Sequence, residues 1–229
     1  MLFDPIYFAF IIPGIALSLF ASWRVKANFK KYSQVPSSCG LSGAQAATEL
    51  LRREGIQGVQ VIKTAGRLSD HYNPITKKLA LSEDTYSSSS IAAIGVATHE
   101  AGHAIQHAQN YAPLWIRSLL VPTANIGSNI GYLVMLFGLF LSSTNMVLVG
   151  AVLFSAVLLF QIVTLPVEFD ASSRAKNLVV EHGIILPQER RGVDAVLNAA
   201  ALTYVAAAIS TLLTLLYFLW RSGLIGGRR

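Results

Sequence analysis

The chain has 229 residues, of which 53% are apolar and only 13% are charged. Together with a mean hydropathy of +0.51, this composition excludes an ordinary soluble protein and favours a membrane protein. A single cysteine, Cys39, excludes an internal disulfide and a zinc site built from thiolates. The net charge of +6 does not indicate a nucleic-acid partner, because the basic residues are scattered or lie beside apolar stretches, where they orient membrane proteins.

The first apolar stretch covers residues 5–23 and is close to the length that crosses a bilayer. It lacks a basic leading segment and a small-residue cleavage site, so we expect a retained transmembrane helix rather than a signal peptide. Four basic residues follow it closely: Arg24, Lys26, Lys30 and Lys31. This positive charge predicts that the C-terminal end of the helix faces the cytoplasm.

Residues 24–128 carry most of the charged side chains and are predicted to form a catalytic region on the cytoplasmic side. Apolar residues recur with helical spacing over residues 42–54, which predicts a short helix. Residues 59–62 and 78–81 have the β-branched and alternating character of strands. We therefore expect a small β-hairpin or sheet in this region.

The sequence His-Glu-x-x-His occurs within a helix predicted over residues 91–109, which the serines at 87–90 are suited to cap. Its four-residue spacing places His99 and His103 on one helix face about one turn apart, where two imidazoles can share a metal ion. Glu100 lies beside them and is the candidate general base. The motif predicts one zinc ion in a metallopeptidase site.

The remaining apolar stretches predict three more transmembrane helices. Residues 129–166 contain no charged residue, and the polar residues 142–145 interrupt them, which indicates transmembrane helices 2 and 3 joined by a tight turn. Residues 167–198 form a polar segment, and residues 199–220 are predicted as transmembrane helix 4. The expected fold is mainly α: a polytopic membrane protein with about four transmembrane helices and a zincin-like α+β catalytic region.

A catalytic zinc ion usually has three protein ligands, so a third ligand must lie elsewhere in the chain. His107 is two helical turns from His99, about 12 Å along the axis, which is too far for both to bind one ion. The pattern with a third histidine after the motif is absent, because Gln109 stands at its position.

The next acidic residues after the motif are Glu168 and Asp170. Two intervening spans return the chain to the side it left, so Glu168 can reach the metal. Asp170 is an alternative ligand, or a residue that orients a zinc-bound histidine. Glu168 could instead form an ion pair with Arg174 or Lys176 at the membrane surface.

The chain resembles the YugP-like neutral zinc metallopeptidases of bacterial membranes, which are relatives of the HtpX-type gluzincins. The resemblance runs in order through residues 40–44, 70–74, 81–82, 99–106, 168–172, 174–175 and 200–204. It implies a zinc site made of His99, His103 and Glu168. Ser172 stands where the HtpX-type pattern has an aspartate.

The expected activity is endopeptidase cleavage of a peptide bond by zinc-activated water, with Glu100 taking the proton. Three residues are candidate donors to the oxyanion: His71, Arg174 and His182. The strand-like segments offer residues 59–63 or 78–82 as an edge for an extended substrate.

We expect a multi-pass protein of the bacterial plasma (inner) membrane, acting on a peptide or protein, including a membrane protein. An oligomer or a regulatory membrane partner is compatible with the sequence. The alternative function is a catalytically idle zinc-binding scaffold. A transporter is disfavoured, because the spans contain almost no ionisable residues.

Overall fold

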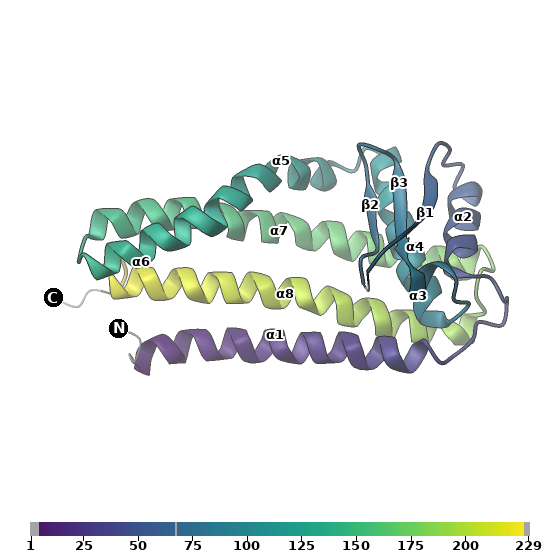
Figure 1. The fold of residues 1–229 in the computed structure, drawn as a ribbon, viewed down its shortest axis with the longest axis horizontal. Coiled ribbons are helices and arrows are strands. Elements are labelled where there is room, and N and C mark those ends of the chain that lie inside the picture. The colour runs from purple at the N-terminus through teal and green to yellow at the C-terminus, as the bar shows by residue number, and fades with distance from the viewer. Residues whose placement is uncertain (1–4, 67, 227–229) are drawn as a thin grey trace. The chain divides into compact units, whose positions relative to one another are not determined.

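A computed structural model describes residues 5–66 and 68–226 of the chain (Figure 1). Within these residues, four helical segments are long and apolar enough to cross a membrane: Pro5–Tyr32, Ala112–Phe140, Thr144–Glu181 and Pro187–Arg221. The chain divides into two compact units. The helical unit comprises Met1–Ala21, Trp115–Leu165 and Thr203–Arg229, and the mixed unit comprises Ser22–Leu114 and Pro166–Leu202.

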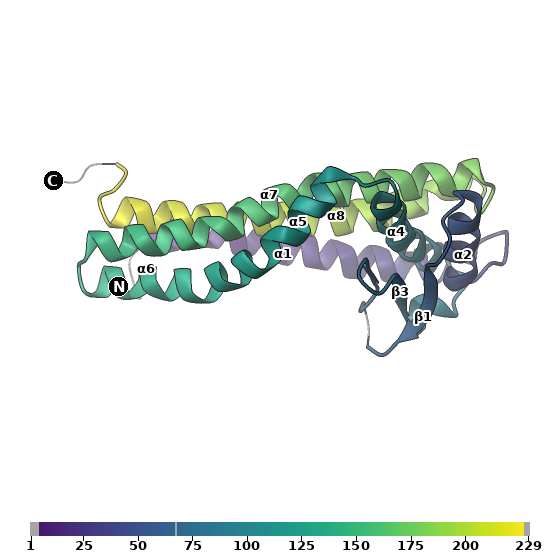
Figure 2. The same cartoon turned by 90° about the horizontal axis from the view of Figure 1, so that it is seen from above.

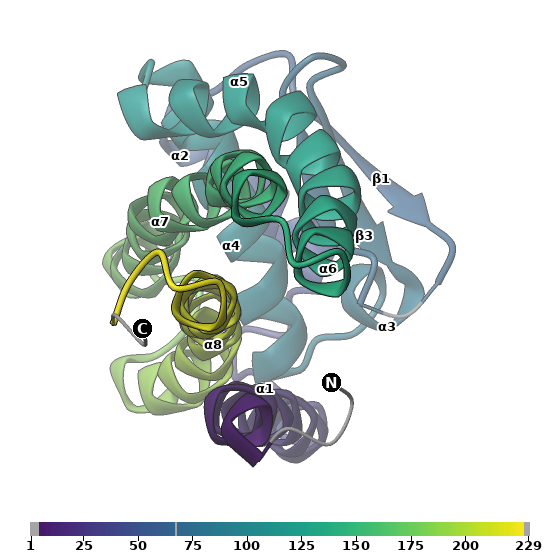
Figure 3. The ribbon, with the colours of Figure 1, turned by 90° about the vertical axis from the view of Figure 1, so that its left-hand side faces the viewer.

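The helical unit is built from parts of five α-helices, which Figure 3 views close to end-on. They are α1 (Pro5–Tyr32), α5 (Ala112–Ile126), α6 (Tyr132–Phe140), α7 (Thr144–Glu181) and α8 (Arg190–Arg221). A single π-helical turn over Gly127–Gly131 joins α5 to α6, so these segments form one continuous helical path. Apolar helices of this kind satisfy their backbone hydrogen bonds internally, as a bilayer requires.

Small residues bring the helices of this unit into backbone contact. A Cβ atom added to Gly131 would lie 2.7 Å from the backbone nitrogen of Phe154 on α7, and one added to Gly150 would lie 2.5 Å from that of Met135. Such close approach is typical of helix packing in membranes, where burial of apolar surface gives little driving force between helices. Large apolar side chains, including Leu119 and Phe140, point outward, as expected of residues that face lipid.

The mixed unit contains the remaining helices and all strands of the described chain (Figure 2). Its elements are α2 (Gly43–Arg53), β1 (Gln60–Thr64), β2 (His71–Asn73), β3 (Lys78–Ser82), α3 (Glu83–Tyr86) and α4 (Ile91–Ala108), together with the nearby ends of α1, α7 and α8 and the 3-10 turn Pro187–Glu189. The strand order is β1-β3-β2, with β1 parallel and β2 antiparallel to β3. A mainly α fold with a small sheet is therefore confirmed.

Polar side chains define where the two longer helices inside this unit begin. The Ser42 hydroxyl accepts a hydrogen bond from the backbone N–H of Gln45, and the Gln45 side chain accepts one from the Ser42 N–H, which forms a capping box. Ser90 caps α4 by accepting from the Ala93 N–H. Each cap satisfies an amide that the helix itself leaves without a partner.

Helix α4 lies at the centre of the mixed unit. Most of its residues are buried, and Ile94 and Ile105 pack in one apolar cluster with Leu50 of α2 and Leu79 and Leu81 of β3. A helix that is buried on nearly all sides is stabilised by packing against the core rather than by ion pairs on a solvent-exposed face. The His-Glu-x-x-His motif therefore lies on a helix that is packed on nearly all sides.

The structure differs from the sequence prediction in the pairing of the strands and in the bounds of the long helices, which extend beyond the predicted spans. The strands predicted at 59–62 and 78–81 pair in parallel, so they do not form a hairpin; the hairpin is made by β3 and the unpredicted strand β2. The second candidate span begins at Ala112 rather than near residue 129, because α5 continues through Arg117 and Pro122, which interrupt the hydropathy pattern without ending the helix.

Candidate metal centre

Helix α4 presents the two motif histidines side by side. The His99 and His103 rings lie with their centroids 4.7 Å apart and almost perpendicular to each other. Both imidazoles are largely withdrawn from solvent, and Glu100 is buried beside them. A pair of imidazoles on successive turns, with a carboxylate next to them, is the arrangement from which a histidine-rich metal site is built.

Helix α7 supplies the third member of the group, Glu168, whose side chain is only 2% exposed. Its Oε2 atom lies 3.3 Å from His99 Nε2 and 3.6 Å from His103 Nε2. Four-coordinate tetrahedral zinc with bonds of about 2.0–2.2 Å has ligand atoms about 3.3–3.6 Å apart. The spacing of these atoms, like their chemistry, fits a zinc ion.

Among the described residues, these three form the group of metal-ligating side chains whose atoms converge, all within 4.8 Å of one another. Two nitrogens and one oxygen are the ligands usual for catalytic zinc, which leaves a coordination position for water or substrate. The donor set therefore matches a catalytic site better than a closed structural site.

A glycine in the motif lets α7 approach α4 closely enough for Glu168 to join the histidines. A Cβ atom added to Gly102 would lie 2.7 Å from the backbone oxygen of Ala171 and 3.3 Å from its carbonyl carbon. Real side chains essentially never pack at the shorter distance, so a residue larger than glycine would push the two helices apart. The contact lies one turn from Glu168 and sets the helix separation at the site.

The second nitrogen of each histidine is held by a polar side chain. Gln106 Oε1 lies 3.0 Å from His103 Nδ1, and Ser172 Oγ lies 3.2 Å from His99 Nδ1. Gln106 and Ser172 are both buried. Outer contacts of this kind fix the orientation of a metal-binding imidazole and decide which nitrogen faces the metal.

The charge around His103 shifts its affinity for protons. Burial by itself lowers the pKa of His103, but the hydrogen bond that Glu168 accepts from its imidazolium and the nearby charge of Glu100 raise it by more. The net pKa therefore lies above the usual histidine value, because two carboxylates stabilise the imidazolium. The same negative surroundings favour a bound cation.

Asp170 and Arg174 lie behind the site rather than in it. Asp170 Oδ2 accepts hydrogen bonds from Gln106 Nε2 at 2.8 Å and from Arg174 Nε at 2.6 Å. Arg174 also donates to Gln109 Oε1 at 2.6 Å. Asp170 thus reaches His103 through Gln106.

The other candidate histidines have partners elsewhere. His71 is exposed on β2, with Nδ1 2.8 Å from the Ser69 carbonyl oxygen. His182 Nε2 lies 2.7 Å from Glu54 Oε1 and links α7 to the end of α2. Neither belongs to the converging metal group.

The sequence prediction assigns no role to two residues that contact the histidines, Gln106 and Ser172. Ser172 appears in it only as the residue that stands where the HtpX-type pattern has an aspartate. His107, set aside as a ligand, lies 2.8 Å through Nδ1 from the hydroxyl of Tyr72 on β2. The signal for Gln106 was its position three residues after His103, which places both side chains on one helix face.

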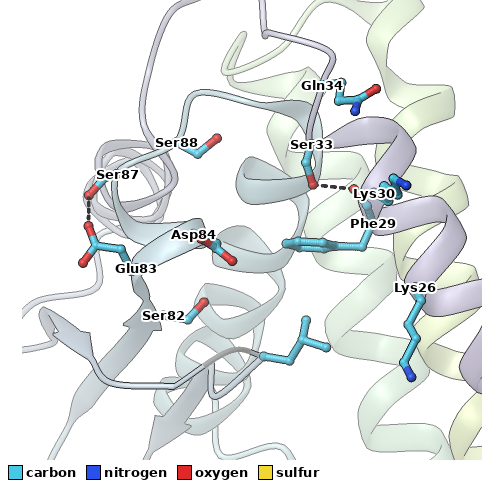
Figure 4. Close-up of a pocket in the computed structure, with 11 residues that line it drawn as sticks. Lys26, Phe29, Lys30, Ser33, Gln34, Ser82, Glu83, Asp84, Ser87 and Ser88 are labelled. Atoms are coloured by element: carbon cyan, nitrogen blue, oxygen red, sulfur yellow. Dashed lines mark hydrogen bonds between the residues drawn. The ribbon is translucent and has the colours of Figure 1, made fainter.

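A separate cavity of about 900 Å³ lies within the mixed unit, between the end of α1 and the start of α3. Figure 4 shows Phe29 of α1 and Asp84 of α3 on opposite walls, with Lys26 and Lys30 along the helix. None of the residues that line this cavity belongs to the metal group. Cavity size therefore does not identify the metal centre; the chemistry of the side chains does.

Comparison with known proteins identifies the family to which the chain belongs. The model of a family described as "Putative neutral zinc metallopeptidase" matches residues 7–223, and the chain belongs to this family. Zinc is accordingly its metal, and the four long apolar helices make it a membrane protein.

One curated relative is similar over nearly its whole length. The chain is 47% identical over 207 residues to a Bacillus subtilis (strain 168) protein named "Putative membrane protease YugP", a match that covers 90% of this chain and 92% of that protein. No solved structure matches the chain. The family description names a zinc peptidase, and the name of this relative describes a membrane protease.

Proposed function

We propose that the chain is a membrane-embedded zinc endopeptidase whose metal is held by His99, His103 and Glu168. The observation that carries the proposal is the convergence of two Nε2 atoms and one carboxylate oxygen at separations that suit tetrahedral zinc. Glu100, buried next to the first histidine, is the proposed general base.

Bound zinc would supply Lewis-acid chemistry, lowering the pKa of water and polarising a carbonyl group. Glu100 would accept the proton of the attacking water and deliver it to the leaving amine. Glu168 would balance part of the charge of the metal. The buried side chains of α4 and α7 exclude bulk water, which strengthens electrostatic interactions inside the site.

The candidates for oxyanion stabilisation are not equally supported. Arg174 is engaged with Asp170 and Gln109, and His182 is engaged with Glu54, so we assign both a structural role. His71 stays a candidate, since its exposed position on β2 leaves it accessible to a substrate.

The sheet limits how an extended substrate could add as a further strand. Strand β3 is paired on both sides, by β1 and by β2, so the predicted addition at residues 78–82 is wrong. The outer edges belong to β1 and β2. Protection of amide protons in residues 59–63 by a bound peptide would support addition at β1, and unchanged exchange there would count against it.

We propose the plasma membrane of a bacterium as the location and the cytoplasmic side for the site. The support is the group of four basic residues that ends the first apolar segment, together with the bacterial relative. The catalytic region is then Ser22–Leu114, with the third ligand in Pro166–Leu202, because residues 115–128 of the predicted region 24–128 lie in the second candidate span. Peptides or proteins, including membrane proteins, are the proposed substrates.

The decisive experiment compares purified full-length wild type with Glu100→Gln in detergent. We expect zinc content to be unchanged and peptide cleavage to fall by roughly 10²–10⁴-fold, because the ligands remain while the base is lost. Glu181→Gln, an exposed change on α7, is the control and should cleave like wild type. Equal cleavage by Glu100→Gln would overturn the proposed role, and no cleavage by any zinc-loaded form would favour the scaffold alternative.

A further inference from the structure

Gln106 is a fully buried polar side chain next to the metal group. It is 0% exposed, and its amide makes three hydrogen bonds that involve both helices of the site. The side-chain oxygen lies 3.0 Å from His103 Nδ1, while the nitrogen donates to Val167 O and to Asp170 Oδ2, each at 2.8 Å. Every polar atom of the amide is therefore in use.

The chemistry of these partners decides which way the amide faces. A backbone carbonyl and a carboxylate oxygen can only accept hydrogen bonds, so the Gln106 nitrogen must lie toward Val167 and Asp170. The oxygen is then left to face His103, and it can only accept. His103 must accordingly carry its proton on Nδ1, which leaves the Nε2 lone pair available toward the metal group.

The same amide also sets the position of the third ligand. Val167 is the neighbour of Glu168 in the chain, so the bond from Gln106 to the Val167 oxygen joins α4 to the turn of α7 that carries the carboxylate. Asp170 is held in turn by Arg174 at 2.6 Å. One side chain thus connects His103, the Glu168 turn and a charged pair.

The two histidines differ in this support. His99 Nδ1 has a neutral hydroxyl partner in Ser172, which can donate or accept and so selects no tautomer. His103 has a partner whose orientation two further acceptors dictate. The surrounding side chains therefore fix the tautomer of His103 but not that of His99.

We propose that Gln106 is a positioning residue of the metal centre: it holds His103 in the Nδ1–H form and fixes the His103 ring relative to Glu168. This inference rests on the proposed metal site. It assigns Gln106 no contact with substrate or metal, and it makes Asp170 a support for Gln106 rather than a ligand.

The test measures zinc affinity of purified full-length protein by competition with a chromophoric chelator. Gln106→Leu should weaken zinc binding roughly 10–100-fold, as loss of an outer partner of a metal-bound histidine typically does. Ser90→Ala is the control, because it removes the cap of the same helix without touching the site. If that variant loses stability but keeps wild-type zinc affinity, general loosening of α4 is not the cause.

An isosteric substitution separates positioning from simple packing. Gln106→Glu keeps the size and shape of the side chain but replaces the amide nitrogen with an oxygen, which would face the Val167 oxygen and the Asp170 carboxylate. It should therefore weaken zinc binding as Gln106→Leu does, although it leaves no cavity. Wild-type zinc affinity in either variant would overturn the proposal.

The zinc-affinity measurements on the Gln106 variants do not depend on whether the protein cleaves peptides. Since zinc affinity is the readout, the Gln106 series can succeed while the Glu100→Gln experiment fails, and the chain would then be a zinc protein without the proposed activity. Loss of the Gln106 effect with intact cleavage would leave the function and remove only the positioning role.

Discussion

Both units of this protein contain helices, but the helices pack differently inside each unit. The helical unit packs through glycines that bring backbones into contact, and it leaves large apolar side chains exposed. The mixed unit buries aliphatic side chains around α4 and places a network of buried polar groups beside them. The first pattern is expected where the solvent around the helices is lipid. The second is expected of an aliphatic core beside a polar site such as the proposed metal centre.

Helix α7 contributes to both units, and its sequence changes from apolar to charged where it passes from one unit to the other. Its first part has no charged residue, and from Glu168 onward it carries Asp170 and Arg174. A single helix can therefore serve as a membrane span and as a wall of a polar site. Substitutions in one unit should leave the properties of the other intact. Of the four predictions below, three concern the mixed unit and one, at Gly131, tests the separation of the units.

The largest effect is expected at Glu168, where the chemistry is concentrated. Glu168→Ala should reduce zinc affinity by more than the roughly 10–100-fold that loss of an outer partner costs, because it removes one of three proposed ligands. Metal analysis after dialysis, beside the exposed Glu181→Ala on the same helix, checks this. Full zinc occupancy in Glu168→Ala would exclude it as a ligand.

Two glycines of α4 provide a matched pair. Gly102→Ala should destabilise the protein by about 1–3 kcal/mol and weaken zinc binding, because its Cβ would strike the Ala171 backbone. At Gly95 an added Cβ meets Val193 at an ordinary 3.5 Å, so Gly95→Ala should be neutral or stabilise by up to about 1 kcal/mol. Thermal unfolding and chelator competition measure both, and equal behaviour of the two would refute the close-approach argument.

A glycine of the helical unit tests whether the units are separable. Gly131→Ala should cost about 1–3 kcal/mol, since the new methyl group would meet the Phe154 backbone nitrogen at 2.7 Å. Zinc affinity should stay within about twofold of wild type, because the site lies wholly in the mixed unit. A parallel fall in zinc affinity would show that packing among the spans controls the metal centre.

The smallest effect is expected at the pair of His182 and Glu54, which are each about one-fifth exposed. His182→Gln should cost about 0–1 kcal/mol, in the range of exposed ion pairs, and leave the rate of cleavage unchanged. Glu54→Gln should behave in the same way. A selective loss of kcat in His182→Gln with normal zinc content would instead indicate that His182 takes part in the reaction.

Much of the fold was readable from local patterns. Hydropathy marked membrane helices, and the serines before residue 91 marked the start of α4, because both signals depend on neighbours within a few residues. The pairing of strands was not readable in this way. Strand β1 is followed along the chain by β2, yet it pairs with β3, and such a choice depends on the whole core rather than on the strands themselves.

The sequence by itself determined that His99 and His103 share one face of a helix with Glu100 beside them, because residues four positions apart become neighbours as soon as the helix forms. It left Glu168 and Asp170 as competing partners and did not reveal Gln106 or Ser172. Only the tertiary structure, with α4 and α7 in contact at Gly102, placed Glu168 against the histidines and Asp170 behind Gln106. Residues more than sixty positions apart meet only through packing, which no local period encodes.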